Sequence, residues 1–215
     1  MAPGARTLGR EGVAPRPVTT GYRVALAGLS ITAIVVQLSR VIDRDGSVVH
    51  FFSYFTIQSN VLAIVSFLWA TVASYRIVSH GLDRFRGAVV VYMLMTGVVY
   101  ALLLSGRTAG ADSTIAWVNT VVHRVMPVAV ALDWLLDPPI ERIGRREAAW
   151  WLAFPLVWTV YTLVRGPIVD WYPYPFIDPG MHGALGVAGY VGGIAVAFVV
   201  MIALVAWIGN LRRAG

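Results

Sequence analysis

The chain alternates long apolar runs with short polar segments. Six of the runs, each of about 20 residues, are long enough to cross the roughly 30 Å hydrocarbon core of a bilayer as helices. They lie near residues 22–42, 52–75, 87–105, 115–136, 148–166 and 185–209. A membrane β-barrel would instead show segments of about ten residues with alternating hydrophobicity, which these runs lack. The pattern therefore predicts an all-α, polytopic membrane protein, a single bundle of six transmembrane helices over residues 22–210.

The composition agrees with a membrane protein. Hydrophobic residues make up 58% of the chain and charged residues 13%, with a mean hydropathy of +0.71. Soluble domains are much less apolar than this, and little chain remains outside the six runs. Residues 1–21 are rich in Pro, Gly and Arg, and we expect them to form a disordered cytoplasmic tail. The sequence has no cysteine, so disulfides and thiolate metal sites are excluded.

The arginines predict how the bundle is oriented. All seventeen basic residues are arginine, and twelve lie in the N-terminal tail, in the loops after the second and fourth spans, and at the C-terminal end: Arg6, Arg10, Arg16, Arg23, Arg76, Arg84, Arg86, Arg142, Arg145, Arg146, Arg212 and Arg213. Cytoplasmic loops of membrane proteins are enriched in basic residues, so we expect both termini in the cytoplasm. Because these residues are scattered over short loops, the net charge of +6 does not indicate nucleic-acid binding.

Two polar side chains interrupt the apolar runs at similar depth from the outer surface. At 1.5 Å per residue, Thr56 lies about 7 Å below the start of its span and His123 about 10 Å below the start of its own. An imidazole is costly in hydrocarbon and transfers protons near neutral pH, which makes His123 a candidate functional residue. Asn60 and Asn119 each lie four residues away, on the same helix face as their candidate.

This arrangement is typical of nucleophilic acyl transfer. A histidine takes the proton of a hydroxyl, and amide donors stabilise the tetrahedral oxyanion. We therefore predict Thr56 and His123 as catalytic residues, supported by Asn60 and Asn119 as oxyanion donors. The structural alternative for Thr56 is a hydrogen bond from its hydroxyl to the carbonyl four residues earlier.

Four other arginines suggest an anionic ligand. They lie at the outer ends of spans or inside the fourth span: Arg40, Arg107, Arg124 and Arg165. A guanidinium binds a carboxylate through two parallel hydrogen bonds, so we predict that they bind the carboxylate of a lipid-like substrate from the bilayer. The alternative for each arginine, taken singly, is extension toward the lipid headgroups.

We expect no cofactor and no metal. A zinc site with an activated water would draw on residues that map to the outer side: His50, His123, His182, Asp43, Asp170 and Asp178. Their spacing matches no known ligand motif, so zinc is the weaker hypothesis. Phosphate-binding glycine loops, GxSxG and HExxH are absent from the sequence, which excludes the soluble nucleotide-binding and hydrolase folds that carry them.

Three segments resemble the androgen-induced gene family of multi-pass membrane proteins, and more closely its bacterial six-span relatives. They are Phe55-Thr56 at the second span, Trp117-Val118-Asn119 through His123 to Pro127 with Asp133-Trp134 following, and Val169-Asp170-Trp171-Tyr172-Pro173-Tyr174-Pro175-Phe176 before the sixth span. The animal members are threonine hydrolases that cleave fatty acid esters of hydroxy fatty acids with one membrane threonine and one membrane histidine. The resemblance implies Thr56 as the nucleophile, His123 as the base and a location in the bacterial inner membrane.

The predicted function is thus an intramembrane lipid ester hydrolase. Ser53 and Ser59 are close enough to Thr56 in the sequence to be rival nucleophiles. The alternative from another class is a non-catalytic lipid- or carboxylate-binding membrane protein or a carrier, in which His123 and Arg124 bind the ligand or relay charge. A zinc-dependent membrane hydrolase is the third hypothesis.

Overall fold

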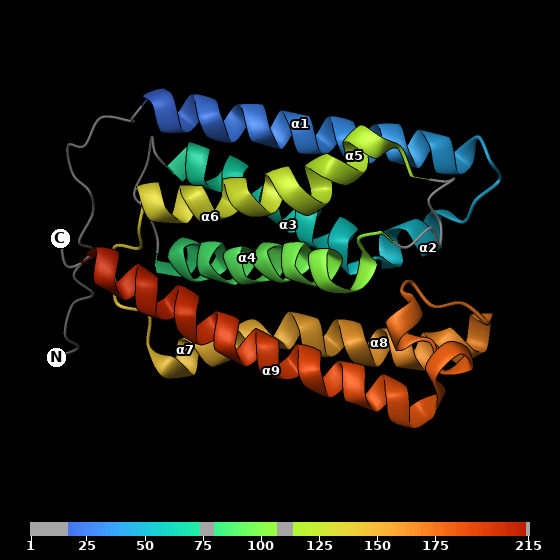
Figure 1. Ribbon diagram of the computed structural model, residues 1–215. Coiled ribbons are helices and arrows are strands. Elements are labelled where there is room, and N and C mark those ends of the chain that lie inside the picture. The colour runs from blue at the N-terminus through green and yellow to red at the C-terminus, as the bar shows by residue number, and fades with distance from the viewer. Residues whose placement is uncertain (1–16, 74–79, 107–113, 214–215) are drawn as a thin grey trace, which may run out of the picture.

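The structure, a computed structural model, describes residues 17–73, 80–106 and 114–213, and this part of the chain is entirely helical apart from its connections. The long helices run side by side (Figure 1) and are α1 (Pro17–Ile42), α3 (Phe55–Ala73), α4 (His80–Val99), α8 (Ala153–Val169) and α9 (Pro179–Arg213). The shorter ones are α2 (Val48–Ser53), α5 (Ala116–Thr120), α6 (Met126–Leu136) and α7 (Arg145–Ala149). Helix α4 lies centrally, and its Val89, Val91 and Met93 are fully buried.

Short segments of other helix types extend the α-helices. Two are π-helical, η1 (Tyr100–Leu104) after α4 and η2 (Val121–Val125) between α5 and α6. Two are 3₁₀ turns, η3 (Trp150–Leu152) between α7 and α8 and η4 (Pro175–Ile177) before α9. The chain is therefore helical without interruption from Ala116 to Leu136.

The described residues include five helices that are long and apolar enough to cross a membrane: Val18–Ile42, Phe55–Ala73, Gly81–Leu104, Arg145–Val169 and Pro179–Arg212. Many of their apolar side chains face outward, such as Leu102 at 76% exposure and Leu185 at 88%. An apolar exterior of this kind suits lipid as the surrounding solvent. The chain is thus an all-α, multi-pass membrane protein. The predicted fourth span is not among the five, because polar residues such as His123, Arg124 and Asp133 lower its hydropathy.

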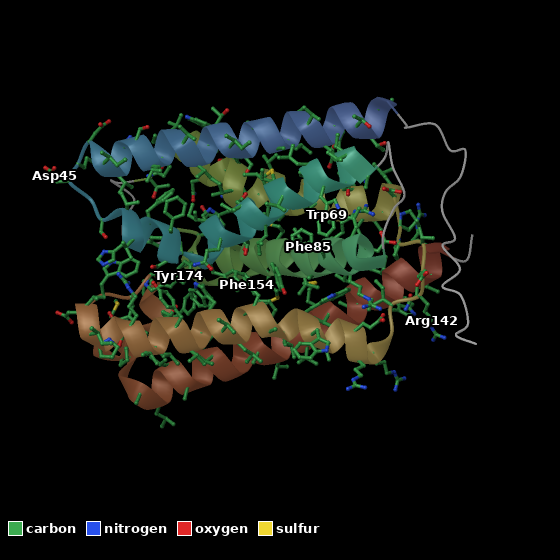
Figure 2. All side chains as sticks on the ribbon, turned by 180° about the vertical axis from the view of Figure 1, so that it is seen from behind. Asp45, Trp69, Phe85, Arg142, Phe154 and Tyr174 are labelled. Atoms are coloured by element: carbon green, nitrogen blue, oxygen red, sulfur yellow. The ribbon has the colours of Figure 1, made fainter. Side chains whose placement is uncertain are left out.

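The N-terminal end of α1 and the C-terminal end of α9 lie at the same side of the bundle. In Figure 1, α1 begins and α9 ends on the left, whereas the connections from α1 to α2 and from α8 to α9 lie on the right. Figure 2 shows the same arrangement from behind, with Arg142 near one end and Asp45 and Tyr174 near the other. We refer to these as the Arg142 end and the Tyr174 end.

Three predicted boundaries differ from the structure. Helix α1 begins at Pro17, inside the tail predicted to be disordered, and residues 1–16 lie outside the described part. The predicted second span is broken at Tyr54, whose backbone is extended (φ −68°, ψ 128°), so α3 begins only at Phe55. The fifth span continues past Gly166 to Val169, with Pro167 inside its last turn.

A buried ion-pair network closes the Arg142 end. Arg23 Nε lies 2.6 Å from Asp133 Oδ1, and Arg86 lies 2.9 Å from Asp133 Oδ2. Arg23 also pairs with Asp137 at 2.6 Å. These contacts join α1, α4 and α6, and they give Asp133 a structural role at this end of the bundle. Each buried charge needs its partner, because a buried charge without one strongly destabilises the fold.

Candidate active site

A cavity of about 540 Å³ opens at the Tyr174 end of the bundle. Its walls come from the ends of α1 and η1, from α2 and the start of α3, from α5 and η2, and from the connection before α9. The polar groups that matter here are Gln37, Thr56, Tyr100, Asn119, His123 and Tyr174. Gln37, Thr56, Asn119 and His123, which come from separate helical segments, therefore face one cavity.

The structure brings Thr56 and His123 together in this cavity. The Thr56 hydroxyl oxygen, Oγ1, lies 3.2 Å from His123 Nε2, within hydrogen-bond distance. Thr56 is 6% exposed, and the two residues are 67 positions apart in the sequence. A hydroxyl in contact with an imidazole, inside a cavity, is the basic geometry of an activated nucleophile.

The second ring nitrogen of His123, Nδ1, determines which tautomer the imidazole adopts. Nδ1 lies 3.1 Å from the backbone carbonyl oxygen of Asn119. A carbonyl can only accept, so Nδ1 carries the hydrogen in the neutral imidazole. Nε2 then has a free lone pair and accepts the hydroxyl hydrogen of Thr56. The carbonyl of Asn119 thus holds His123 in the tautomer that a general base requires.

The local sequence explains why His123 is presented at this point. Pro127 has no N–H, so the carbonyl four residues before it, that of His123, loses its helical partner. The helix widens just before this proline into the π-helical η2, where the Met126 N–H donates to the Val121 carbonyl. Such π-helical turns occur frequently at functional sites. The ring of Tyr100, which opens η1, stacks on His123 with centroids 4.2 Å apart and stabilises the imidazole orientation.

Thr56 lies in the first turn of α3 because the chain breaks at Tyr54. The first N–H groups of a helix have no intrahelical acceptor, and the helix dipole makes this end positive. The N–H of Thr56 donates to the Tyr174 hydroxyl at 3.2 Å, and Ile57, the next residue, lines the cavity. The nucleophile candidate therefore lies where negative charge is favoured.

The side-chain amides of the two asparagines predicted as oxyanion donors bind acceptors within the protein. The Asn60 amide nitrogen donates to the carbonyls of Thr56 (2.9 Å) and Val122 (3.2 Å), and its side chain is fully buried. It therefore ties α3 to η2. The Asn119 amide donates to the Tyr100 hydroxyl at 2.6 Å. Both N–H groups of Asn60 are used in these bonds, which leaves none for an oxyanion, whereas Asn119 lines the cavity and its role as an oxyanion donor stays a prediction.

The described arginines among the four predicted for the substrate carboxylate do not line the cavity. Arg107 lies outside the described residues, and none of Arg40, Arg124 and Arg165 lines the cavity. The Arg124 side chain is exposed and lies 5.7 Å from the Tyr100 ring, on the outside of the site. Arg165 lies 5.7 Å from the ring of Trp171, which does line the cavity. Arg40, Arg124 and Arg165 therefore do not form the expected carboxylate site on the cavity wall.

The histidines and aspartates proposed for zinc also remain apart. His50 stacks on Trp171 at 4.1 Å, and His182 faces Tyr190 at 5.1 Å. Within residues 17–73, 80–106 and 114–213 there is no group of three side chains placed to hold a metal ion. Burial, and then the nearby Arg165 charge, lower the pKa of His50, so it is neutral at neutral pH.

The rival nucleophiles lie outside the cavity wall. Ser53 Oγ donates to the Val49 carbonyl at 2.7 Å and contacts the Tyr161 hydroxyl at 3.0 Å. Ser59 is fully buried in α3. Neither serine is among the residues that line the cavity, whereas Thr56 is. The geometry therefore favours Thr56 among the three hydroxyls.

The sequence pattern gives Tyr174, in the segment before the sixth span, no role in the site. The structure places its hydroxyl 3.1 Å from Thr56 Oγ1. A signal was present, since Tyr174 stands between Pro173 and Pro175, which restrict the backbone and fix the direction of a side chain. Tyr100 was missed as well, and no sequence signal could have found it. Its contact with His123 depends on two π-helical segments that no apolar pattern predicts.

Comparison of the chain with protein-family models, with curated proteins and with solved structures finds no match. The chemistry of the site therefore rests on the geometry of its own residues.

Proposed function

We propose that this chain is an intramembrane hydrolase of lipid esters, in which Thr56 is the nucleophile and His123 the general base. The observation that carries the proposal is the continuous line of contacts from the Thr56 hydroxyl through the His123 imidazole to the Asn119 carbonyl, facing a cavity among membrane helices. This is the nucleophile, base and orienting group of acyl transfer. The resemblance to the androgen-induced gene family suggests the same pair of residues.

In the first half of the reaction, His123 Nε2 removes the hydroxyl proton while Thr56 Oγ1 bonds to the acyl carbon of the ester. The electrons of the carbonyl double bond move to its oxygen, which becomes the oxyanion of a tetrahedral intermediate. The intermediate collapses, the bond to the alcohol oxygen breaks, and that oxygen takes the proton from His123. The alcohol leaves, and the acyl group remains on Thr56.

In the second half, water attacks the acyl carbon and gives its proton to His123 Nε2. The bond between the acyl carbon and Thr56 Oγ1 breaks, and Oγ1 recovers a proton from His123. The products are one carboxylic acid and one alcohol for each ester and water consumed. We assign the oxyanion to the first turn of α3, where the positive end of the helix favours negative charge.

We further propose that the protein crosses the bacterial inner membrane six times, with both termini in the cytoplasm. Besides the five long apolar helices, the predicted fourth span is the remaining crossing. It is the helical stretch from Ala116 to Leu136, which lies alongside α1 and α4 in Figure 1. The common side of the α1 start and the α9 end, together with the arginines near that side, supports this orientation. The cavity then opens in the outer half, where a lipid ester from the bilayer reaches it.

A fluorophosphonate probe and a chromogenic long-chain ester test the function on the purified full chain. We expect the probe to modify Thr56, as located by peptide mass spectrometry. Thr56→Ala and His123→Ala should each lose labelling and at least about a thousandfold in ester turnover. Ser59→Ala is the matched control, because it removes a buried hydroxyl of the same helix that does not face the cavity, and it should keep both activities.

Each rival function predicts a different result in the same assay. A lipid-binding protein or carrier would bind fatty acids without labelling or ester turnover. A zinc hydrolase would lose turnover in a chelator and recover it with added zinc. Either result, or unchanged turnover in both alanine variants, would refute the threonine hydrolase.

A further inference from the structure

Tyr174 contacts the candidate nucleophile through two hydrogen bonds. Its hydroxyl lies 3.2 Å from the Thr56 backbone nitrogen and 3.1 Å from Thr56 Oγ1, although the two residues are 118 positions apart. The backbone N–H can only donate, so the Tyr174 oxygen accepts that bond. The Thr56 hydroxyl hydrogen is directed to His123, so the second contact is a bond that Tyr174 donates to a lone pair of Oγ1.

The fold holds Tyr174 in this position before any substrate binds. Its backbone is extended (φ −137°, ψ 142°), the conformation that the following Pro175 imposes. Its ring stacks on Phe176 with centroids 5.2 Å apart and meets the rings of Tyr54 and Trp158 at 5.5 Å and 5.9 Å. Figure 2 shows Tyr174 in the space between the start of α3 and α8. The hydroxyl therefore needs no reorganisation to act.

Tyr174 also keeps its proton over the working range of the enzyme. Burial raises the pKa of its phenol to about 12. The group is a neutral donor at every pH at which His123 exchanges protons, and it does not compete with His123 as a base.

We propose that Tyr174 is a third catalytic residue, which donates its hydroxyl hydrogen bond to Thr56 Oγ1 as negative charge develops on that oxygen. This inference rests on the proposed ester hydrolase. Charge develops on Oγ1 when His123 removes its proton, and again when the bond to the acyl group breaks. Tyr174 stabilises the oxygen in both steps and transfers no proton, so the proton balance stays between Thr56, His123, the alcohol and water.

The direct test is Tyr174→Phe, which removes the hydroxyl and keeps the ring. We expect kcat and the rate of fluorophosphonate labelling to fall about a hundredfold, comparable to the loss of one donor to a developing oxyanion, with KM nearly unchanged. The matched control is Tyr92→Phe. The Tyr92 hydroxyl is buried and donates to the Trp151 carbonyl at 2.9 Å, away from the cavity, so this variant should lose a comparable bond without loss of rate.

A ring-fluorinated tyrosine at position 174 keeps the test decisive if Tyr174→Phe does not fold. Fluorine makes the phenol more acidic at nearly constant size, so a donating Tyr174 shifts the labelling rate and makes it decline at high pH as the phenol ionises. A tyrosine that only packs would leave the rate unchanged and overturn the inference. If the wild-type protein labels and Tyr174→Phe labels equally fast, only the role of Tyr174 is refuted; if the wild-type protein neither labels nor hydrolyses esters, the proposed function is refuted with it.

Discussion

A threonine hydroxyl becomes a useful nucleophile only when its proton has an acceptor and the resulting charge has donors. Thr56 has both, because His123 Nε2 lies on one side of Oγ1 and the Tyr174 hydroxyl on another. The Asn119 carbonyl adds to this arrangement, since in the proposed reaction it stabilises the imidazolium that forms when His123 takes the proton. Two polar contacts at Thr56 Oγ1, and a third at the far side of the His123 ring, thus define the geometry of the site at the residue scale.

The pH dependence of turnover follows from these groups. His123 must be neutral to accept a proton, so kcat/KM should rise with pH through the imidazole titration. The rate should then stay level well into the alkaline range, because burial raises the pKa of Tyr174 to about 12 and its phenol stays protonated. Ester turnover measured from acid to alkaline pH checks this. A rate that is highest at acid pH would contradict His123 as the base.

At the scale of the elements, the site depends on irregular helix geometry. The break at Tyr54 places Thr56 in the first turn of α3, and the π-helical η2 before Pro127 places His123 opposite it. Asn60 holds these two elements together through the carbonyls of Thr56 and Val122. Its amide thus positions the site, and it does so from a fully buried location where unpaired polar groups are costly.

Replacing Asn60 by alanine should therefore affect both stability and chemistry. We expect a loss of about 1–3 kcal/mol, since two buried carbonyls lose their donor, together with slower labelling of Thr56 by the fluorophosphonate probe. Asn210→Ala is the matched control, because the Asn210 side chain similarly bridges backbone groups of Ile143, at the Arg142 end. Thermal unfolding in detergent and labelling of the folded fraction measure the two effects. Equal labelling rates in both variants would refute the role of Asn60 in positioning the site.

The molecule as a whole has two polar ends with different purposes. The Arg142 end is closed by buried ion pairs among Arg23, Arg86 and Asp133, which join three helices. The Tyr174 end holds the cavity and its hydroxyl, imidazole and phenol groups. The buried ion pairs and the candidate reactive groups thus lie at opposite ends of the bundle.

The proposed orientation predicts which end is accessible from outside the cell. Since the natural chain has no cysteine, single-cysteine variants provide a clean test. A membrane-impermeant maleimide should label Asp43→Cys, at the Tyr174 end, in intact cells. It should label Arg142→Cys only after the membrane is permeabilised, because arginine-rich loops stay in the cytoplasm. The opposite pattern would show that the topology is inverted. Labelling of both variants in intact cells would show that positions 43 and 142 do not lie on opposite sides of the membrane.

The sequence alone determined the helical class, the approximate spans and the two candidate residues Thr56 and His123. These are local properties, because a run of about 20 apolar residues specifies a membrane helix and a polar residue within it is conspicuous without any partner. Even so, the break at Tyr54 escaped the apolar pattern, since backbone direction changes there without any change in hydrophobicity.

Only the tertiary structure decided which polar groups meet. The contact of Thr56 with His123 spans 67 residues and that with Tyr174 spans 118, so packing between helices sets both distances. The same packing directed the Asn60 amide to two carbonyls and left Arg124 on the exterior, against the predicted roles. Helical spacing specifies the face on which a side chain lies, whereas the neighbour of that face depends on how every other helix is arranged.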